Sequence, residues 1–331
     1  MRRERVLSVV VLVCAACAGA FGQKSPKDTE IVVPASYKAP SMESSTELQA
    51  ALESAVNDTL AAFQARNFKS DELAATLIDL RAPGVMRSAA VRGDQPIYPA
   101  SVVKLFYLAA LERQIEDKKV MSTTELARGV KDMIVDSSNE ATQYILDVLT
   151  GTSSGAELPP KEFDAWQYKR NRVNRFYSSM GYTNINVNQK TFCEDAYGIE
   201  QQSRNYKGQN RNMITTNATA RLLAEIVTGN IATPARTQEM MSLLRRDPFG
   251  KGDGEDQAHG FTGKLLIDRK MTDAKLWSKA GWTSKARHDA AYIETADGLK
   301  FVLVVYTENH AADKDAIPMI AGKIIDSLRK K

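Results

Sequence analysis

Cysteine and histidine are scarce in this 331-residue sequence, which contains three of each. Two of the cysteines, Cys14 and Cys17, lie in an apolar N-terminal run, so Cys193 is left without a partner for an intramolecular disulfide. The three histidines do not have the spacing of a metal site. The sequence therefore argues against a disulfide scaffold and against a zinc enzyme, and we expect neither a metal nor a cofactor.

A large charge of one sign and a membrane-spanning run are also lacking. The formal net charge is +4 at pH 7, which is too balanced to indicate a nucleic-acid partner. The N-terminal apolar run VLSVVVLVCAACAGA follows MRRER and is short for a bilayer. With small residues at Ala18, Ala20 and Gly22, it predicts a secretory signal peptide over 1–22 and hence a periplasmic or secreted protein. A membrane anchor and lipidation at Cys17 are the alternatives.

Beyond the predicted signal, the chain divides into a linker and one domain. Residues 23–45 are polar and contain three prolines, which predicts a flexible tether. The pattern TELQAALESAVNDTLAAF has apolar residues at helical spacing and predicts that a folded domain begins at about residue 46 and continues to 331. The sequence shows no internal repeat.

Strand patterns are confined to the two ends of this domain. They are ELAATLIDLRA and RSAAVR early in the domain and AKLWSKAGW, DAAYIETA and LKFVLVVYTEN late. Helical patterns dominate residues 101–250, and a last helix is predicted from about 313 to 329. We predict an α+β fold in which an antiparallel sheet from both chain ends is covered by the terminal helices and interrupted by an all-helical insertion. Residues 151–175 and the stretch DPFGKGDGEDQAHG lack periodicity, which predicts surface loops.

A possible nucleophile lies in IYPASVVKLFYL, where Ser101 precedes Lys104 by three positions. On a helix these two side chains share a face. An amine among apolar neighbours is partly desolvated, which favours the neutral form that can accept a proton from serine. The S-x-x-K pattern occurs roughly once by chance in a chain of this length. On this motif alone, a capping serine and a surface lysine would be the better explanation.

Two further motifs follow in an informative order. Ser137 and Asn139 stand at a predicted helix start, although Ser137 and Glu140 also form a capping-box pattern. Lys279 and Gly281 form a K-x-G pattern on a late predicted strand. The three motifs occur in the order S-x-x-K, S-x-N and K-x-G, and each lies on the element that its chemistry needs. A chance occurrence of this combination is much less probable than that of any single motif.

In these motifs the sequence resembles the penicillin-recognising serine hydrolases, and most closely the class A β-lactamase-like family. The resemblance covers about residues 46–329 and includes the pattern TTNATARLLAEIVTG and the closing strand DGLKFVLVVYTEN. It implies an exported enzyme that forms an acyl-enzyme with a β-lactam, a peptide or a related acyl substrate.

The resemblance also implies roles for individual residues. Ser101 is the acylated nucleophile, and Lys104 accepts its proton. Ser137 relays a proton to the leaving nitrogen, Asn139 binds the substrate amide, and Lys279 supplies positive charge.

The third motif departs from the family pattern. The backbone N–H groups of Ser101 and Trp282 are expected to form the oxyanion hole beside Gly281. Ala280 replaces the usual hydroxyl residue that helps to bind a substrate carboxylate, and Thr283 or Ser284 would substitute for it. The segment between the first two motifs is also shorter than in typical class A enzymes, which removes a loop that walls the pocket.

The carboxylate that would activate the deacylating water is not obvious. We choose Glu194, with Glu200 second, and a solvated loop glutamate explains either residue about as well. Cys193 is expected as a buried thiol. Arg287 and His288 are candidates for binding a substrate carboxylate, although solvation at a strand edge is the simpler expectation for them.

The resulting prediction is a monomeric serine hydrolase with weak or atypical β-lactamase activity. One rival is a DD-peptidase or transpeptidase of cell-wall peptides, which needs the same acylating residues and no dedicated deacylating glutamate. The other is a penicillin-binding protein that keeps the fold and turns over poorly.

Overall fold

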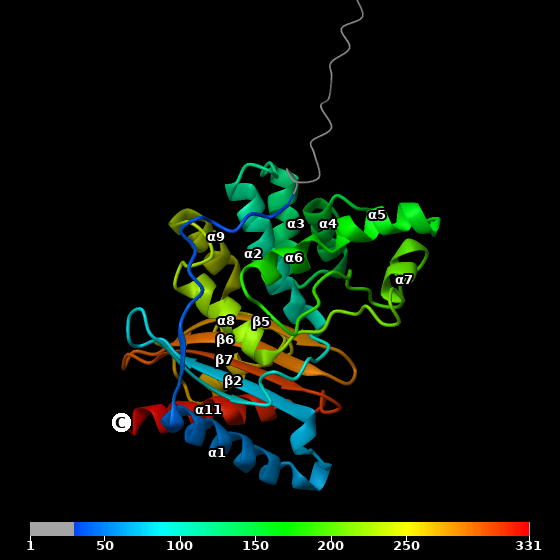
Figure 1. Ribbon diagram of the computed structural model, residues 1–331. Coiled ribbons are helices and arrows are strands. Elements are labelled where there is room, and N and C mark those ends of the chain that lie inside the picture. Colours follow the sequence, from blue (N-terminus) through cyan, green and yellow to red (C-terminus); the bar gives the residue numbers. More distant parts are fainter. Residues whose placement is uncertain (1–29, 331) are drawn as a thin grey trace, which may run out of the picture. The chain divides into compact units, whose positions relative to one another are not determined.

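Seven strands form one sheet in the computed structural model, which describes residues 30–330 (Figure 1). The sheet order is β1-β3-β2-β7-β6-β5-β4. The strands are β1 (Met42–Ser44), β2 (Leu73–Asp79), β3 (Met86–Val91), β4 (Arg245–Arg246), β5 (Lys275–Trp282), β6 (Arg287–Glu294) and β7 (Lys300–Thr307). All neighbouring pairs are antiparallel except β1 and β3, which are parallel. The predicted α+β fold with a largely antiparallel sheet is confirmed.

Strands from the two ends of the domain meet inside the sheet, where β2 pairs with β7. Helices α1 (Thr46–Ala62) and α11 (Ala316–Arg329) lie side by side on one face of the sheet (Figure 1), and α10 (Thr262–Asp268) packs beside α11. Leu52 of α1, Leu303 of β7 and Ile324 of α11 belong to the apolar core between these helices and the sheet. The terminal helices therefore cover one face, as predicted.

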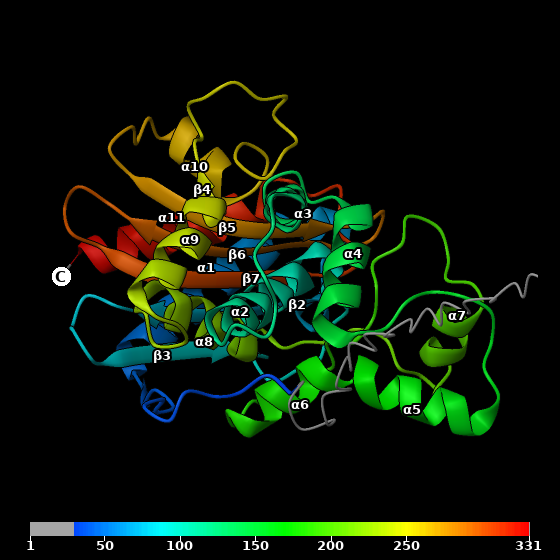
Figure 2. The ribbon, with the colours of Figure 1, turned by 90° about the horizontal axis from the view of Figure 1, so that it is seen from above.

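The remaining α-helices come between β3 and β4 in the chain and form the helical insertion. They are α2 (Val103–Glu116), α3 (Thr124–Ile134), α4 (Asn139–Thr150), α5 (Pro160–Arg170), α6 (Arg172–Ser179), α7 (Ile199–Arg204), α8 (Thr216–Val227) and α9 (Pro234–Leu244). Seen from above, α2, α8 and α9 lie over the other face of the sheet, whereas α5 and α7 lie together to one side (Figure 2).

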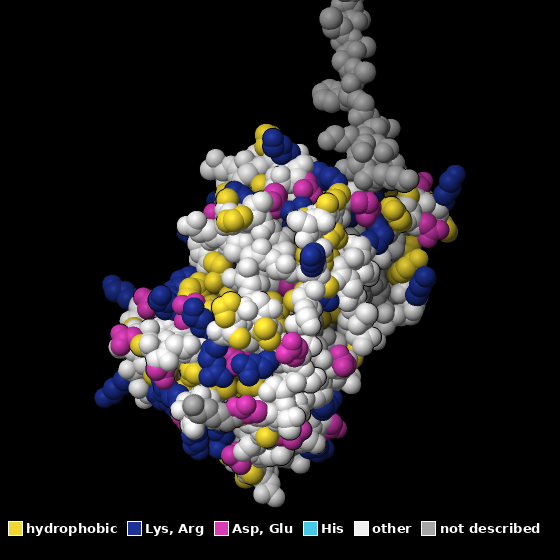
Figure 3. Space-filling view, turned by 60° about the vertical axis from the view of Figure 1, so that its left-hand side comes forward, with side chains coloured by type: hydrophobic (Ala, Val, Ile, Leu, Met, Phe, Trp, Pro, Cys, Tyr) yellow, Lys and Arg dark blue, Asp and Glu magenta, His cyan; other side chains and the backbone are white. Residues whose placement is uncertain are grey.

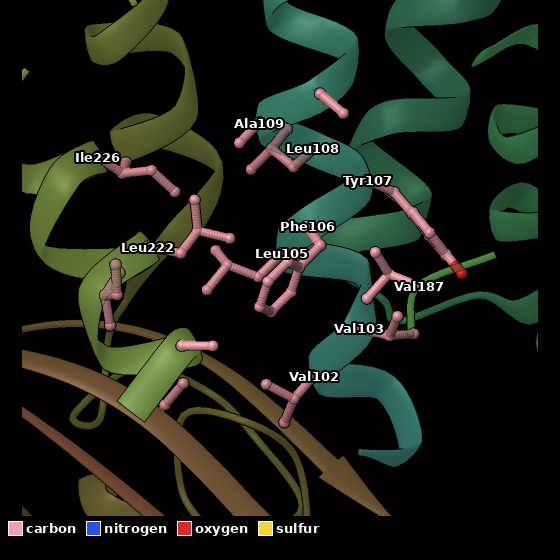
Figure 4. Packing of buried hydrophobic residues seen from close by; sticks show 14 of the residues in the cluster. Val102, Val103, Leu105, Phe106, Tyr107, Leu108, Ala109, Val187, Leu222 and Ile226 are labelled. Atoms are coloured by element: carbon pink, nitrogen blue, oxygen red, sulfur yellow. The ribbon is translucent and has the colours of Figure 1, made fainter. Parts of the chain in front are cut away.

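Helix α2 is the centre of the second core. Its residues 103–111 are completely buried, and Leu105 and Phe106 face Leu222 of α8 (Figure 4). A helix that is apolar on all sides is typical of a protein interior. Because tight packing fixes α2 on all sides, the residues at its N-terminal end are held rigidly.

Residues 31–45 pack against the domain, which corrects the prediction of a flexible tether for that part of 23–45. Ile31 is 5% exposed and belongs to the core around α2, and the Tyr37 hydroxyl donates a hydrogen bond to Glu225 (3.0 Å). β1 then adds to the edge of the sheet beside β3. The sequence could not predict these contacts, because isolated apolar residues among prolines and polar residues show no periodic pattern.

The stretch 151–175 also differs from the predicted surface loop, since it contains α5 and the start of α6. α5 begins with Pro160 at its first position, which suits a helix start. Its amphipathic character is weak, and tertiary contacts hold it instead: Arg170 lies over the ring of Trp166 (4.3 Å to the centroid) and pairs with buried carboxylates described below. Local periodicity therefore could not reveal it.

The predicted signal peptide (1–22) and residues 23–29 lie outside the described residues. Within residues 30–330, no helix combines the length and the apolar character needed to cross a membrane. On the face in Figure 3, Lys and Arg side chains are interspersed with Asp and Glu side chains.

Replacing Ile31 by alanine tests whether this segment is part of the folded domain. We expect Ile31→Ala to lower the free energy of unfolding by about 2 to 5 kcal/mol, because it leaves a cavity in the core. The neighbouring change Val32→Ala is the matched control, because Val32 is 47% exposed and its loss should have little effect. Urea denaturation of the two variants measures the difference, and equal midpoints would mean that the segment is a tether.

Candidate active site

Ser101 lies in a 3-10 turn that leads directly into α2. The turn begins at Ala100, whose φ of 46° is unusual for a residue with a side chain and marks local strain. Gly281 of β5 packs directly against this turn: a Cβ atom there would lie 2.8 Å from the backbone nitrogens of Ser101 and Val102. Only glycine permits such an approach. The strand that carries the third motif therefore lies against the backbone of Ser101.

Lys104 lies one turn further along and is completely buried. Its amine donates hydrogen bonds to the Ser137 carbonyl, to Asn139 Oδ1 (2.9 Å) and to Ser137 Oγ (3.3 Å). Burial lowers the pKa of Lys104 to about 7, against the smaller opposing effects of Glu140 and Cys193. A substantial fraction of the amine is therefore neutral at physiological pH. No hydrogen bond within residues 30–330 joins Lys104 to Ser101.

Ser137 stands between the two lysines of the predicted site. Its hydroxyl lies 3.0 Å from the amine of Lys279 and 3.3 Å from that of Lys104. The capping-box alternative for Ser137 is wrong, because Ser138 caps α4 by accepting a hydrogen bond from Ala141 N (3.1 Å). Ser137 instead adopts a left-handed backbone conformation with φ of 59°, and its side chain is available to the lysines.

Lys279 is completely buried, and burial lowers its pKa well below the usual value, reinforced by the nearby charges of Lys104 and Arg246. It donates to Ser137 Oγ (3.0 Å), to the Ala280 carbonyl (2.8 Å) and to Gln257 Oε1 (2.6 Å). Gln257 was missed by the sequence analysis. It lies in the stretch DPFGKGDGEDQAHG, where no pattern marks one residue as special.

The loop before α7 presents a thiol to this cluster. Asn139 Nδ2 donates a hydrogen bond to Cys193 Sγ (3.4 Å), and Cys193 is exposed, which corrects the expectation of a buried thiol. Glu194 is also exposed and makes no hydrogen bond or ion pair with any described residue of 30–330. It lines a cleft of about 420 Å³ that also includes Tyr98 and Arg211. The carboxylate chosen as deacylating base is therefore not held by a hydrogen bond or ion pair to Lys104 among the described residues.

Glu200, the second choice, has a structural role. It is 1% exposed and accepts hydrogen bonds from Arg170 Nη1 (2.6 Å) and Nη2 (2.8 Å), and it lies 3.2 Å from the amine of Lys190. Burial opposes its ionisation, but the contacts with Arg170 outweigh this effect and lower its pKa. The ion pairs join the two ends of the loop that carries Cys193.

The residues after Lys279 shape the rim of the site. Ala280 points into the core beside α11, so its side chain does not face the cleft. Trp282 is 45% exposed at the end of β5. The Thr283 hydroxyl accepts hydrogen bonds from the backbone of Lys285 (3.1 Å) and Ala286 (3.0 Å) and so holds the turn between β5 and β6.

Arg287 and His288 are both buried, which overturns the expectation of strand-edge solvation. Arg287 lies 3.9 Å from the ring centroid of Phe261 and donates to the Gly260 carbonyl. His288 contacts the Tyr98 carbonyl through Nε2 (2.9 Å), and its Nδ1 accepts from a backbone N–H of β7 (3.2 Å). Burial lowers the pKa of His288 to about 4, so the ring is neutral. Among residues 30–330, no group of three or more His, Cys, Asp or Glu side chains is arranged to hold a metal ion.

The model of the beta-lactamase enzyme family matches residues 51–328. The chain belongs to this family. Its members are serine hydrolases of β-lactam or amide bonds, and the chain is an enzyme of this kind. No curated protein sequence matches it significantly.

Solved structures of the same fold include β-lactamases and a penicillin-binding protein. A β-lactamase from Sphaerobacter thermophilus is 18% identical with a TM-score of 0.59, covering 84% of this chain and 98% of that chain. PBP-A is 17% identical with a TM-score of 0.58, covering 89% and 100%. A PBP-A mutant solved as an acyl-enzyme complex with penicillin-G is 16% identical with a TM-score of 0.60, covering 87% and 98%.

Replacing the two candidate glutamates separates their roles. Glu200→Ala should lower the free energy of unfolding by about 3 to 5 kcal/mol, because it leaves Arg170 as a buried cation without its main partner. Glu194→Ala, the control, should leave the denaturation midpoint almost unchanged because the side chain is exposed. Chemical denaturation followed by circular dichroism measures both. Equal stability of the two variants would show that the ion pairs of Glu200 do not hold the loop.

Proposed function

We propose that the protein is an exported, monomeric hydrolase that forms an acyl-enzyme on Ser101 with a β-lactam or a cell-wall peptide. The observation that carries the proposal is the chain of polar contacts from the buried Lys104 through Ser137 to the buried Lys279, located where β5 packs against the turn of Ser101. A buried amine with a pKa of about 7, one helical turn from a serine, is suited to accept its proton. The N-terminal sequence pattern supports export.

Acylation proceeds through a tetrahedral intermediate. Ser101 Oγ bonds to the substrate carbonyl carbon as its proton moves to the neutral amine of Lys104. The negative carbonyl oxygen accepts hydrogen bonds from the backbone N–H groups of Ser101 and Trp282. The carbon–nitrogen bond then breaks as the Ser137 hydroxyl protonates the leaving nitrogen, and Ser137 regains a proton from Lys104 over their 3.3 Å contact. Asn139 is suited to bind the substrate amide at the mouth of the site.

Deacylation is proposed to be slow. Hydrolysis of the ester needs a base that orients water, and Cys193 rather than a carboxylate lies against Asn139. Without that base, the general-base contribution of roughly 10² to 10⁴ in rate is lost. We therefore propose weak β-lactamase activity, with antibiotic resistance as a minor consequence at most.

A DD-peptidase or transpeptidase is the second candidate. The exposed position of Glu194 and its lack of contacts favour it, because such enzymes share the acylating residues and do not depend on a dedicated deacylating glutamate. A low-turnover penicillin-binding protein differs from this candidate only in the rate at which the ester is lost.

Incubation with penicillin-G, followed by intact-mass analysis over time, tests the proposal. We expect a one-to-one adduct that accumulates and decays slowly, that maps to the peptide containing Ser101, and that is absent in Ser101→Ala. Glu194→Gln should change the decay only slightly. Steady turnover of about 10² per second, abolished by Glu194→Gln, would instead identify an efficient β-lactamase with Glu194 as its base. Labelling that persists in Ser101→Ala would refute the assignment of the nucleophile.

The pH dependence of acylation tests the role of Lys104. Because burial lowers the pKa of this amine to about 7, its neutral form gains population as pH rises, and the acylation rate should increase between pH 6 and 8 with a midpoint near 7. Lys104→Arg should acylate at least about a hundredfold more slowly, because arginine keeps the charge and cannot accept the proton. Stopped-flow measurement with a chromogenic β-lactam gives both rates. A profile without a midpoint near 7 would mean that Lys104 is structural.

A further inference from the structure

We infer that Gln257 is a specificity-determining residue. It accepts hydrogen bonds from the two donors, Lys279 Nζ and Ala280 N, that would otherwise bind a carboxylate on the leaving group, and it therefore disfavours substrates that carry one. The inference rests on the proposed acyl-enzyme chemistry and narrows its substrate class. Acyl donors with a neutral group next to the leaving nitrogen are the preferred substrates. Penicillins carry a carboxylate at this place, as do peptides in which a single C-terminal residue follows the scissile bond. We expect both to be poorer substrates.

The amine of Lys279 has no hydrogen left for a substrate. An ammonium group has three N–H bonds. In this structure it has three acceptors at hydrogen-bond distance, which are Ser137 Oγ (3.0 Å), the Ala280 carbonyl (2.8 Å) and Gln257 Oε1 (2.6 Å). The contact with Gln257 is the shortest of the three. A substrate carboxylate would have to displace one of these acceptors before it could pair with Lys279.

Gln257 also occupies the edge of β5. Its Oε1 accepts a hydrogen bond from Ala280 N (3.2 Å), at a position beyond the short strand β4, which pairs only with Leu276 and Trp277. A substrate lying along this edge therefore finds the N–H of Ala280 already bound. The side chain of Ala280 adds no hydroxyl to replace these donors.

The orientation of the Gln257 amide is determined by its neighbours. On one side it meets Lys279 and Ala280 N, which can only donate. On the other side its Nε2 donates to the carbonyls of Ile134 (3.1 Å) and Val135 (2.8 Å), which can only accept. A reversed amide would place donor against donor on one side and acceptor against acceptor on the other. Because Gln257 is 5% exposed, water does not compete for these bonds.

Other positive groups near the site do not compensate. Arg246 is 5% exposed, and its guanidinium donates to the carbonyls of Leu243 (3.0 Å) and Ile134 (3.1 Å). Arg287 is 5% exposed and stacked on Phe261. The carboxylate of Asp289, the cross-strand partner of Ala280, is itself buried. Burial raises the pKa of Asp289, and as the partner of Ala280 it lies on the face of the sheet away from the cleft, where it accepts a hydrogen bond from Thr262 N (3.1 Å).

Matched substrates and matched variants test the inference. The substrates are penicillin-G and its methyl ester, which differ only in the carboxylate, and the readout is the second-order rate of adduct formation on Ser101. We expect the wild type to react with the ester at least as fast as with the free acid. Gln257→Ala frees donors of Lys279 and Ala280 and should raise the acid-to-ester rate ratio about tenfold or more, as expected for a hydrogen bond to a charged group. Gln257→Glu places a carboxylate there and should lower the ratio below that of the wild type.

Gln202→Ala is the control, because Gln202 also bridges backbone groups, at Leu158 N (3.0 Å) and Leu158 O (2.9 Å), away from the site. It should leave the ratio unchanged. Equal changes of the acid and ester rates in both Gln257 variants would show a purely structural role and overturn the inference, as would a wild type that strongly prefers the acid. If Gln257→Ala does not fold, the isosteric Gln257→Glu decides alone. Absence of any adduct with either compound would refute the proposed function instead.

Discussion

Two lysines that are buried within reach of one serine hydroxyl are the constraint on which the rest of the site depends. Lys104 and Lys279 both contact the Ser137 hydroxyl, and both are completely buried. Two like charges in a region of low dielectric repel each other strongly, and burial alone already disfavours an ammonium group. The protein relieves this cost in two ways, by surrounding the amines with neutral oxygen acceptors and by favouring the neutral form of Lys104.

This arrangement requires that three distant parts of the chain be held within a few ångströms. The tightly packed helix α2 fixes Lys104, the start of α4 fixes Ser137, and β5 supplies Lys279. Gly281 permits the close approach of β5 to the turn of Ser101, and Gln257 connects β5 to the carbonyl of Ile134 at the end of α3. A displacement of any one of these elements would remove acceptors from a buried amine, which is costly. The same contacts therefore serve folding and chemistry.

The loop that carries Cys193 shows a different division of roles. Its ends are joined through the buried ion pairs of Glu200 with Arg170 and Lys190, whereas Cys193 is exposed and accepts a hydrogen bond from Asn139. Glu200, the second of the two glutamates that the sequence analysis considered for catalysis, is thus used for structure. The proposal of slow ester loss rests on this loop, because it places the thiol of Cys193 against Asn139.

The sequence by itself determined the α+β class, the strands at both ends, the insertion of helices, and the three motifs that carry Ser101, Lys104, Ser137 and Lys279. It could do so because these features are local: apolar periodicity specifies helix or strand, and each motif occupies one turn or one strand. Only the tertiary structure decided the rest. Contacts between residues far apart in the chain determine the packing of residues 31–45, the position of α5 and the burial of Arg287. They also determine the surroundings of Cys193, Glu200 and Gln257. In an aperiodic loop, the sequence does not show which polar side chain will be buried or bonded. The role of each side chain is set by the lysine, carbonyl or solvent that folding places beside it.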